Sequence, residues 1–285
     1  MRISSQQVFD SGVQSMQQHT SDVVEYQRQI SSGQRYRLAS DDALAAGLGV
    51  QIALDKSQFA MFKVNQDHIN ASLVSTDSQL NNINLALTKF QQMMVQAGND
   101  ALGPENRKLL GQQAMALRDA VNQFAHAEDA NGQRILRVET PSKVLVAPSV
   151  ELETALSYAE VMEGTHDVLA FMTEIAEKLD PANINPAPAV MPSPLAPSSN
   201  DFDRMQAILN QVTRAQVKTG LLQNQLDAAT EAADVQKTNV ELQRSTLLDT
   251  DLATATASLV KSNALLQAAQ SVMSKLDANT LFQRL

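Results

Sequence analysis

Two pairs of aspartates are the residues of this sequence whose spacing could most readily support chemistry. Asp41 and Asp42 are adjacent, and Asp249 and Asp251 are separated by one residue. Carboxylates this close could share a proton for acid–base catalysis or supply oxygen ligands to Ca²⁺. An EF-hand loop that starts at Asp249 would need glycine at its sixth position and glutamate at its twelfth. The sequence has threonine and valine there, so this kind of calcium site is excluded.

Helix capping explains the same carboxylates without a ligand. Ser40 can cap the start of a helix, with Asp41 and Asp42 in its first turn, where the helix dipole favours negative charge. Asp249 or Thr250 would serve the last helix in the same way. We therefore predict helix caps at two bends of the chain, contributed by Ser40, Asp41, Asp42, Asp249 and Asp251.

Other reactive groups do not form a recognisable site. Gly47 and Gly49 are followed by Ile52 where a dinucleotide-binding loop needs its third glycine. The four histidines lie in no metal-binding spacing, there is no cysteine, and no serine lies in a G-x-S-x-G turn. We expect no catalytic residue, metal or cofactor, and no enzymatic activity.

The composition favours helices that pack along stripes. Of the 285 residues 44% are hydrophobic but only 4% are aromatic, and tryptophan is absent. A net charge of −9 argues against nucleic-acid binding, which requires concentrated Lys and Arg. No stretch resembles a cleaved secretory signal or is long and apolar enough to cross a membrane. Taken alone, these features predict a cytoplasmic protein without membrane insertion.

The elements that carry these residues are long helices with apolar positions spaced alternately by four and three residues. Such spacing places the positions on one stripe of a helix. A helix over 55–98 would be about 65 Å long. The stripes near the two ends of the chain are weaker, and they match each other in length. The four stripes begin at Phe9, Ile69, Met205 and Leu252, and the first continues through Val13, Met16, Thr20, Val23, Gln27 and Ile30.

The middle of the chain is predicted to contain shorter elements and a spacer. A return helix is expected over 104–128, and Asn131-Gly132 is a turn signal. One or two small hairpins are expected within 134–153, then a short helix capped by Thr165. Residues 181–200 contain six of the nine prolines, which indicates a spacer.

The predicted fold is therefore mainly α, with long antiparallel helical rods in a bundle, paired N- and C-terminal helices and a small β-containing insertion. The domain boundaries follow the helix breaks. They are an N-terminal assembly helix over 1–39, a helical rod core over 40–130, a short β/helix insertion with the Pro-rich linker over 131–200, a returning rod helix over 201–248, and a C-terminal assembly helix over 249–285.

Several local motifs resemble the bacterial flagellin superfamily. The family opens M-R-I/F-S-T and continues through Q-x-S-T-G-K-R and P-S-D-D-P-x-A-A, with alanine here in place of both prolines. The endings A-L-Q-A and S-L-F are typical of its hook-filament junction branch. The chain lacks the family's G-x-Y-x-F-x-G turn. The matching segments are Met1-Arg2-Ile3-Ser4-Ser5, Gln29-Ile30-Ser31-Ser32-Gly33-Gln34-Arg35, Ala39-Ser40-Asp41-Asp42-Ala43-Leu44-Ala45-Ala46, Ala264-Leu265-Leu266-Gln267-Ala268-Ala269 and Thr280-Leu281-Phe282.

The resemblance implies a structural role in the flagellum. It implies export without a cleaved signal peptide to an extracellular location, which replaces the cytoplasmic prediction. It also implies a homo-oligomeric helical ring, with a hook-side hook-associated protein, flagellin and an export chaperone at the C-terminal helix as partners. A filament-forming flagellin and a helical secretion or signalling hairpin protein stay open as alternatives. The expected assembly interface comprises Phe9, Val13, Met16, Val23, Ile30, Leu252, Leu259, Leu266, Met273, Leu276 and Phe282.

Overall fold

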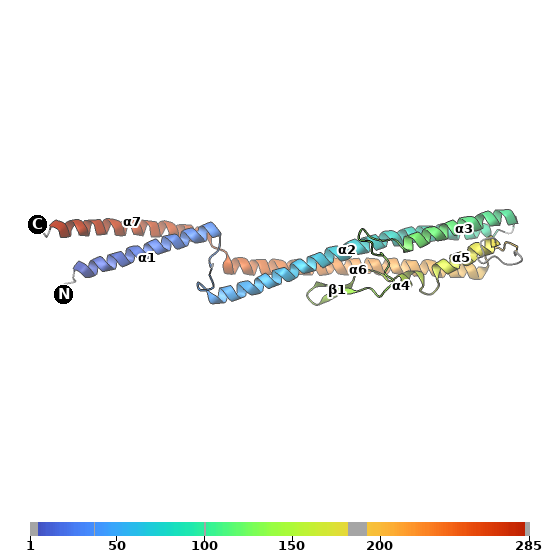
Figure 1. The fold of residues 1–285 in the computed structure, drawn as a ribbon, viewed down its shortest axis with the longest axis horizontal. Coiled ribbons are helices and arrows are strands. Elements are labelled where there is room, and N and C mark those ends of the chain that lie inside the picture. Colours follow the sequence, from blue (N-terminus) through green and yellow to red (C-terminus); the bar gives the residue numbers. More distant parts are fainter. Residues whose placement is uncertain (1–4, 37, 100, 182–192, 283–285) are drawn as a thin grey trace. The chain divides into compact units, whose positions relative to one another are not determined.

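The computed structural model describes residues 5–36, 38–99, 101–181 and 193–282 (Figure 1). The predicted Pro-rich spacer over 181–200 lies largely outside these residues. The described part contains seven helices and one antiparallel hairpin, so the predicted mainly α class with a small β insertion is confirmed. The elements are α1 (Ser5–Ser32), α2 (Ala43–Ala97), α3 (Pro104–Ala125), β1 (Lys143–Ala147), β2 (Val150–Glu153), α4 (Tyr158–Met162), α5 (Val168–Leu179), α6 (Ser199–Leu248) and α7 (Leu252–Phe282).

The chain divides into two compact units. Unit 1 comprises Met1–Gln58 and Gln236–Leu285, and unit 2 comprises Phe59–Val235. The division falls inside α2 and α6, not at the breaks between helices. No proline interrupts either helix, and the glycine in the middle of α6, Gly220, lies off its apolar stripe.

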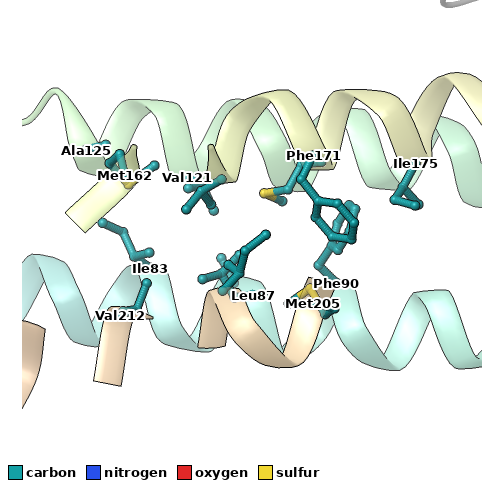
Figure 2. Close-up of a cluster of buried hydrophobic side chains, with 14 of the residues drawn as sticks. Ile83, Leu87, Phe90, Val121, Ala125, Met162, Phe171, Ile175, Met205 and Val212 are labelled. Carbon is teal, nitrogen blue, oxygen red and sulfur yellow. The ribbon is translucent and has the colours of Figure 1, made fainter. Parts of the chain in front are cut away.

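Unit 2 contains the larger hydrophobic core. Side chains of α2 and α6 meet those of α3, α4 and α5, and the Phe90 and Phe171 rings pack edge to face with centroids 6.4 Å apart (Figure 2). The predicted α2 stripe is confirmed, because every apolar member of it is fully buried. Its members are Ile69, Leu73, Leu80, Ile83, Leu87, Phe90, Met94 and Ala97.

The hairpin is fastened to α2 by two amide side chains. Asn65 Nδ2 donates to the Leu145 carbonyl and Gln66 Nε2 donates to the Val146 carbonyl, each over 2.7 Å. Leu152 on the second strand joins a smaller core between α2 and α6. Sequence periodicity predicted a hairpin here, but the run at 134–138 forms only isolated bridges and no strand.

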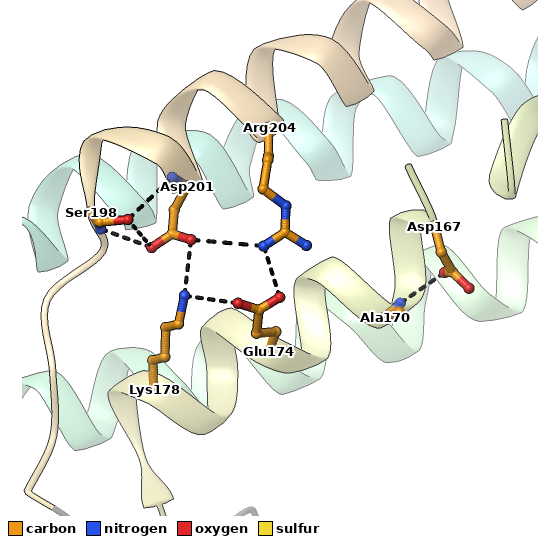
Figure 3. A network of polar contacts seen from close by, with 7 residues as sticks. All are labelled: Asp167, Ala170, Glu174, Lys178, Ser198, Asp201 and Arg204. Carbon is orange, nitrogen blue, oxygen red and sulfur yellow. Dashed lines mark hydrogen bonds and ion pairs between the residues drawn. The ribbon is translucent and has the colours of Figure 1, made fainter. Parts of the chain in front are cut away.

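A polar cluster fixes the start of α6 against α5 (Figure 3). Asp201, only 2% exposed, accepts hydrogen bonds from the Ser198 backbone amide at 2.8 Å and from Lys178 Nζ at 2.9 Å. Glu174 pairs with both Lys178 and Arg204 at 2.8 Å. Because every charge in the cluster has an opposite neighbour, the buried carboxylate is compensated.

The cap of α5 corrects one prediction. Asp167 Oδ1 accepts from the Ala170 backbone amide at 2.9 Å, so Asp167 caps this helix and Thr165 does not. The Thr165 amide instead donates to Gln211 Oε1 at 2.8 Å. The side chain of Gln211, which is buried on α6, thus provides the hydrogen-bond acceptor for the backbone of the loop before α5.

Candidate assembly interface

The terminal helices α1 and α7 lie side by side in unit 1 (Figure 1). Each turns a stripe of six residues inward with alternating spacings of four and three, the pattern of a coiled-coil seam. The α1 stripe is half-buried and the α7 stripe is partly or fully buried. The two stripes are Gly12, Met16, His19, Val23, Tyr26 and Ile30 on α1, and Ala255, Leu259, Ser262, Leu266, Ala269 and Met273 on α7.

Most of the described residues that sequence analysis assigned to the interface lie on or beside these stripes. Val13, Met16, Val23 and Ile30 are half-buried on α1. On α7, Leu259 and Leu266 are half-buried and Met273 is 7% exposed. Phe9 and Leu252 are 43% and 54% exposed, so they are not buried within the chain. The side chains of Leu276 and Phe282 lie outside the described part of the structure.

The sequence prediction placed every second position of the α1 stripe one residue too late in the chain. It extended the stripe through Thr20 and Gln27, but both are exposed, and their neighbours His19 and Tyr26 turn inward. Two heptad registers one residue apart are hard to separate in a stripe with few large apolar residues. Gly12, His19 and Tyr26 recur every seven residues, and this spacing is the signal that could have identified the inward positions.

At Gly12 a side chain of α7 lies directly against the α1 backbone. A Cβ atom built on Gly12 would lie 2.7 Å from Met273 Sδ. Small residues on α7, Ala255 and Ser262, are likewise buried where α1 packs. The interface therefore depends on small side chains as well as on large apolar ones.

The bend between α1 and α2 is tied to the break between α6 and α7. Gly33 has φ +68°, a left-handed conformation that glycine adopts without strain and that ends α1. Its carbonyl accepts from the Thr250 amide at 2.9 Å, and the Arg35 amide donates to the Leu248 carbonyl at 2.8 Å. These backbone bonds flank an antiparallel bridge between Gln34 and Asp249.

The first predicted cap moves by two residues, from Ser40 to Asp42. Asp42 Oδ1 accepts from the amides of Leu44 and Ala45 at 3.0 and 2.9 Å, so α2 begins at Ala43 and Asp42 caps it. Ser40 lies in the preceding turn, where Asp41 Oδ2 accepts from the Leu38 amide at 3.1 Å. Asp42 is the cap because only the side chain nearest to the helix start can reach the free amides of the first turn.

The second break uses its two aspartates differently. Asp251 Oδ1 accepts from the Ala253 amide at 3.0 Å, and Asp251 Oδ2 from Thr254 Oγ1 at 2.7 Å. These bonds, that of Thr254 above all, lower the pKa of Asp251 and identify it as the cap of α7. Asp249 is not a cap; it pairs with Arg244 at 3.1 Å. The carboxylates of Asp41, Asp42 and Asp251 thus accept hydrogen bonds from backbone amides, and that of Asp249 pairs with an arginine.

The described residues offer no metal centre. They include no group of three or more His, Cys, Asp or Glu side chains that could hold a metal ion. None of the described helices carries an apolar stretch of the length needed to cross a bilayer.

Comparison with known families identifies the superfamily. Residues 3–139 match the family model of the bacterial flagellin N-terminal helical region, and residues 203–285 match that of the C-terminal helical region. The chain belongs to the bacterial flagellin superfamily. Membership implies assembly into the flagellum with other flagellar proteins.

Among flagellin-superfamily relatives, flagellar hook-associated protein 3 of Escherichia coli is 22% identical, with 99% of each chain covered. The flagellar filament 30.7 kDa core protein of Treponema maltophilum is also 22% identical, over 89% of this chain and 87% of that protein. The crystal structure of the flagellar junction protein from Legionella pneumophila matches with a TM-score of 0.52 at 11% identity, covering 70% of this chain and 99% of that one. The structural match supports a shared fold.

Proposed function

We propose that this flagellin-superfamily chain is a structural subunit of the junction between the flagellar hook and filament. The carrying observation is the match to hook-associated protein 3 over 99% of both chains, which includes both terminal helices. The paired helices α1 and α7, which leave apolar residues such as Phe9 and Leu252 exposed, supply a surface for a helical ring of subunits, with a hook-side hook-associated protein and flagellin as neighbours. In this proposal the subunit is exported to the extracellular flagellum without cleavage, and a chaperone holds its C-terminal helix.

Electron microscopy of a deletion strain tests the junction role. Loss of a junction subunit should leave hooks without attached filaments, and the intact gene should restore the filaments. A deletion strain that carries normal filaments would contradict the proposal.

Flagellin itself is the second candidate, because the Treponema relative is named as a filament core protein and is matched over most of its length. Self-assembly of the purified protein distinguishes the two. A filament subunit should polymerise into long filaments under conditions in which a junction subunit forms only short oligomers.

Replacing Gly12 with leucine should impair assembly. Leucine is the better helix former by about 0.8 kcal/mol, so α1 itself would not be weakened. Its side chain would instead meet Met273 Sδ, so Met273 must shift and the packing of α1 on α7 must change. We expect filament attachment to fall severalfold, measured as the fraction of hooks that carry filaments. Exposed Gln14 offers a control, Gln14→Leu. If Met273→Ala partly restores filament attachment to Gly12→Leu, the clash lies between these two residues. An equal loss of attachment in Gly12→Leu and Gln14→Leu would contradict the prediction.

The terminal helices should be less protected than unit 2 in the isolated subunit. The α1 stripe is only half-buried, whereas the α2 stripe is fully buried, so α1 gains less from packing. Amide hydrogen exchange on a confirmed monomer should be fast in α1 and α7 and slow around Leu80–Met94. Strong protection over Val13–Ile30 and Leu259–Leu276 would show instead that the ends are already ordered before assembly.

A further inference from the structure

Two adjoining hollows in unit 2 share a positively charged boundary. They lie between α2 and the loop that joins α3 to β1, with volumes of about 590 and 220 Å³. His68, Arg134 and Arg137 line both hollows. We call this pair of hollows the arginine trough.

The two arginines are positioned by the fold and are available to a ligand. The Arg137 amide donates to the Leu156 carbonyl at 2.9 Å, and the Arg137 carbonyl accepts from the Tyr158 amide at 2.7 Å. The Arg137 guanidinium donates to Gln133 Oε1 at 2.7 Å, a neutral partner. Across the residues that the structure describes, no carboxylate lies within ion-pair distance of Arg134 or Arg137. This is notable in a chain whose net charge is −9.

The acidic residues of the trough do not cancel this charge. Asp129 Oδ1 accepts from the Gln133 and Asn131 amides at 2.9 and 2.8 Å. These bonds, that of Gln133 first, lower the pKa of Asp129, with a smaller contribution from the charge of Arg137. Asp129 therefore belongs to the turn. Glu139 lines only the larger hollow and is exposed, so it would oppose an anion there from a solvated position.

We propose that the arginine trough binds the carboxylates of an extended acidic peptide. A guanidinium presents two parallel N–H donors that match a carboxylate, and two of them can hold neighbouring acidic side chains. The trough extends over two hollows, more space than a single small anion would fill. Hydroxyl side chains of Ser72, Ser75 and Thr140 line its walls and can bond to a peptide backbone. The proposal is independent of the junction role.

The test is binding of a fluorescently labelled hexaglutamate peptide to the full-length protein at low salt, followed by anisotropy. We expect saturable binding that weakens about tenfold in Arg134→Gln and in Arg137→Gln. Arg214, an exposed arginine of α6 that does not line the trough, provides the control Arg214→Gln, which removes the same charge and should leave binding unchanged. Circular dichroism melts should confirm that each variant is folded; Arg134→Gln decides if Arg137→Gln is destabilised.

Three results would overturn the proposal. The first is no saturable binding of the peptide. The second is an equal loss of binding in Arg214→Gln, which would indicate a general charge effect. The third is inorganic phosphate that competes at the same concentration as hexaglutamate, which would mean that the trough takes a lone oxyanion and not a peptide.

Discussion

Replacing Leu80 with aspartate should unfold most of unit 2 at temperatures where the wild-type protein is stable. Leu80 is fully buried on α2, in the core shared with α3, α5 and α6. A carboxylate at this position would have no partner, so it must stay charged and unpaired or take up a proton, and the apolar contacts of leucine are lost as well. We expect a loss of about 4 kcal/mol or more in the free energy of unfolding. Thermal denaturation followed by circular dichroism measures it.

Leu85 supplies the matched control for this variant. It lies on the same helix but is 57% exposed. Leu85→Asp makes the same chemical change in contact with water and should alter the free energy of unfolding by only about 0.5 kcal/mol. Equal melting temperatures for the two variants would show that the α2 stripe is not the core of the unit.

Replacing Asp201 with alanine is expected to have the next largest effect on stability. The substitution leaves the Ser198 amide without its acceptor and Lys178 with only Glu174 as an acidic partner. Lys178 and Glu174 are partly exposed, so water compensates some of the loss. We expect a cost of about 2–4 kcal/mol in denaturant unfolding. Asp203→Ala, at an exposed position of the same helix, should cost little.

The pH dependence of the stability difference between wild type and Asp201→Ala tests whether the charge of Asp201 is its origin. Burial alone would raise the pKa of Asp201, but the Ser198 and Lys178 hydrogen bonds outweigh burial and lower it. A lowered pKa in the folded state stabilises the protein above the ordinary aspartate pKa, and this contribution disappears as the pH falls through the folded value. The gap between wild type and Asp201→Ala should therefore be widest near neutral pH and should narrow in acid. A gap that is constant with pH would assign the effect to packing.

Strong periodicity made the long helices predictable. The α2 stripe contains large apolar residues at nearly every inward position, so only one register buries them all. In α1, glycine, threonine, glutamine and histidine lie on or next to the stripe, and the partner helix decides which of them turn inward. Sequence therefore located Met16, Val23 and Ile30 but not Gly12, whose importance arises from its distance to Met273.

Local polar choices were less predictable. Ser40, Asp41 and Asp42 can all cap a helix, and Thr165 and Asp167 compete in the same way before α5. In each case the residue adjacent to the first helical turn is the cap, and tertiary contacts decide where that turn begins. The run at 134–138 has strand-forming residues, but no neighbouring segment pairs with it along its length.

The backbone bridge at Gln34 and Asp249 has a consequence for how proteins of this architecture can diverge. It brings the chain back to the place where it left the terminal helices, so everything between the two residues is, in topological terms, an insertion into one helical hairpin. The bonds that flank it join backbone groups only, at Gly33, Arg35, Leu248 and Thr250, and so, apart from the glycine that the left-handed turn favours, they depend little on side-chain identity. The enclosed segment can therefore be lengthened, shortened or replaced while the hairpin keeps its closure.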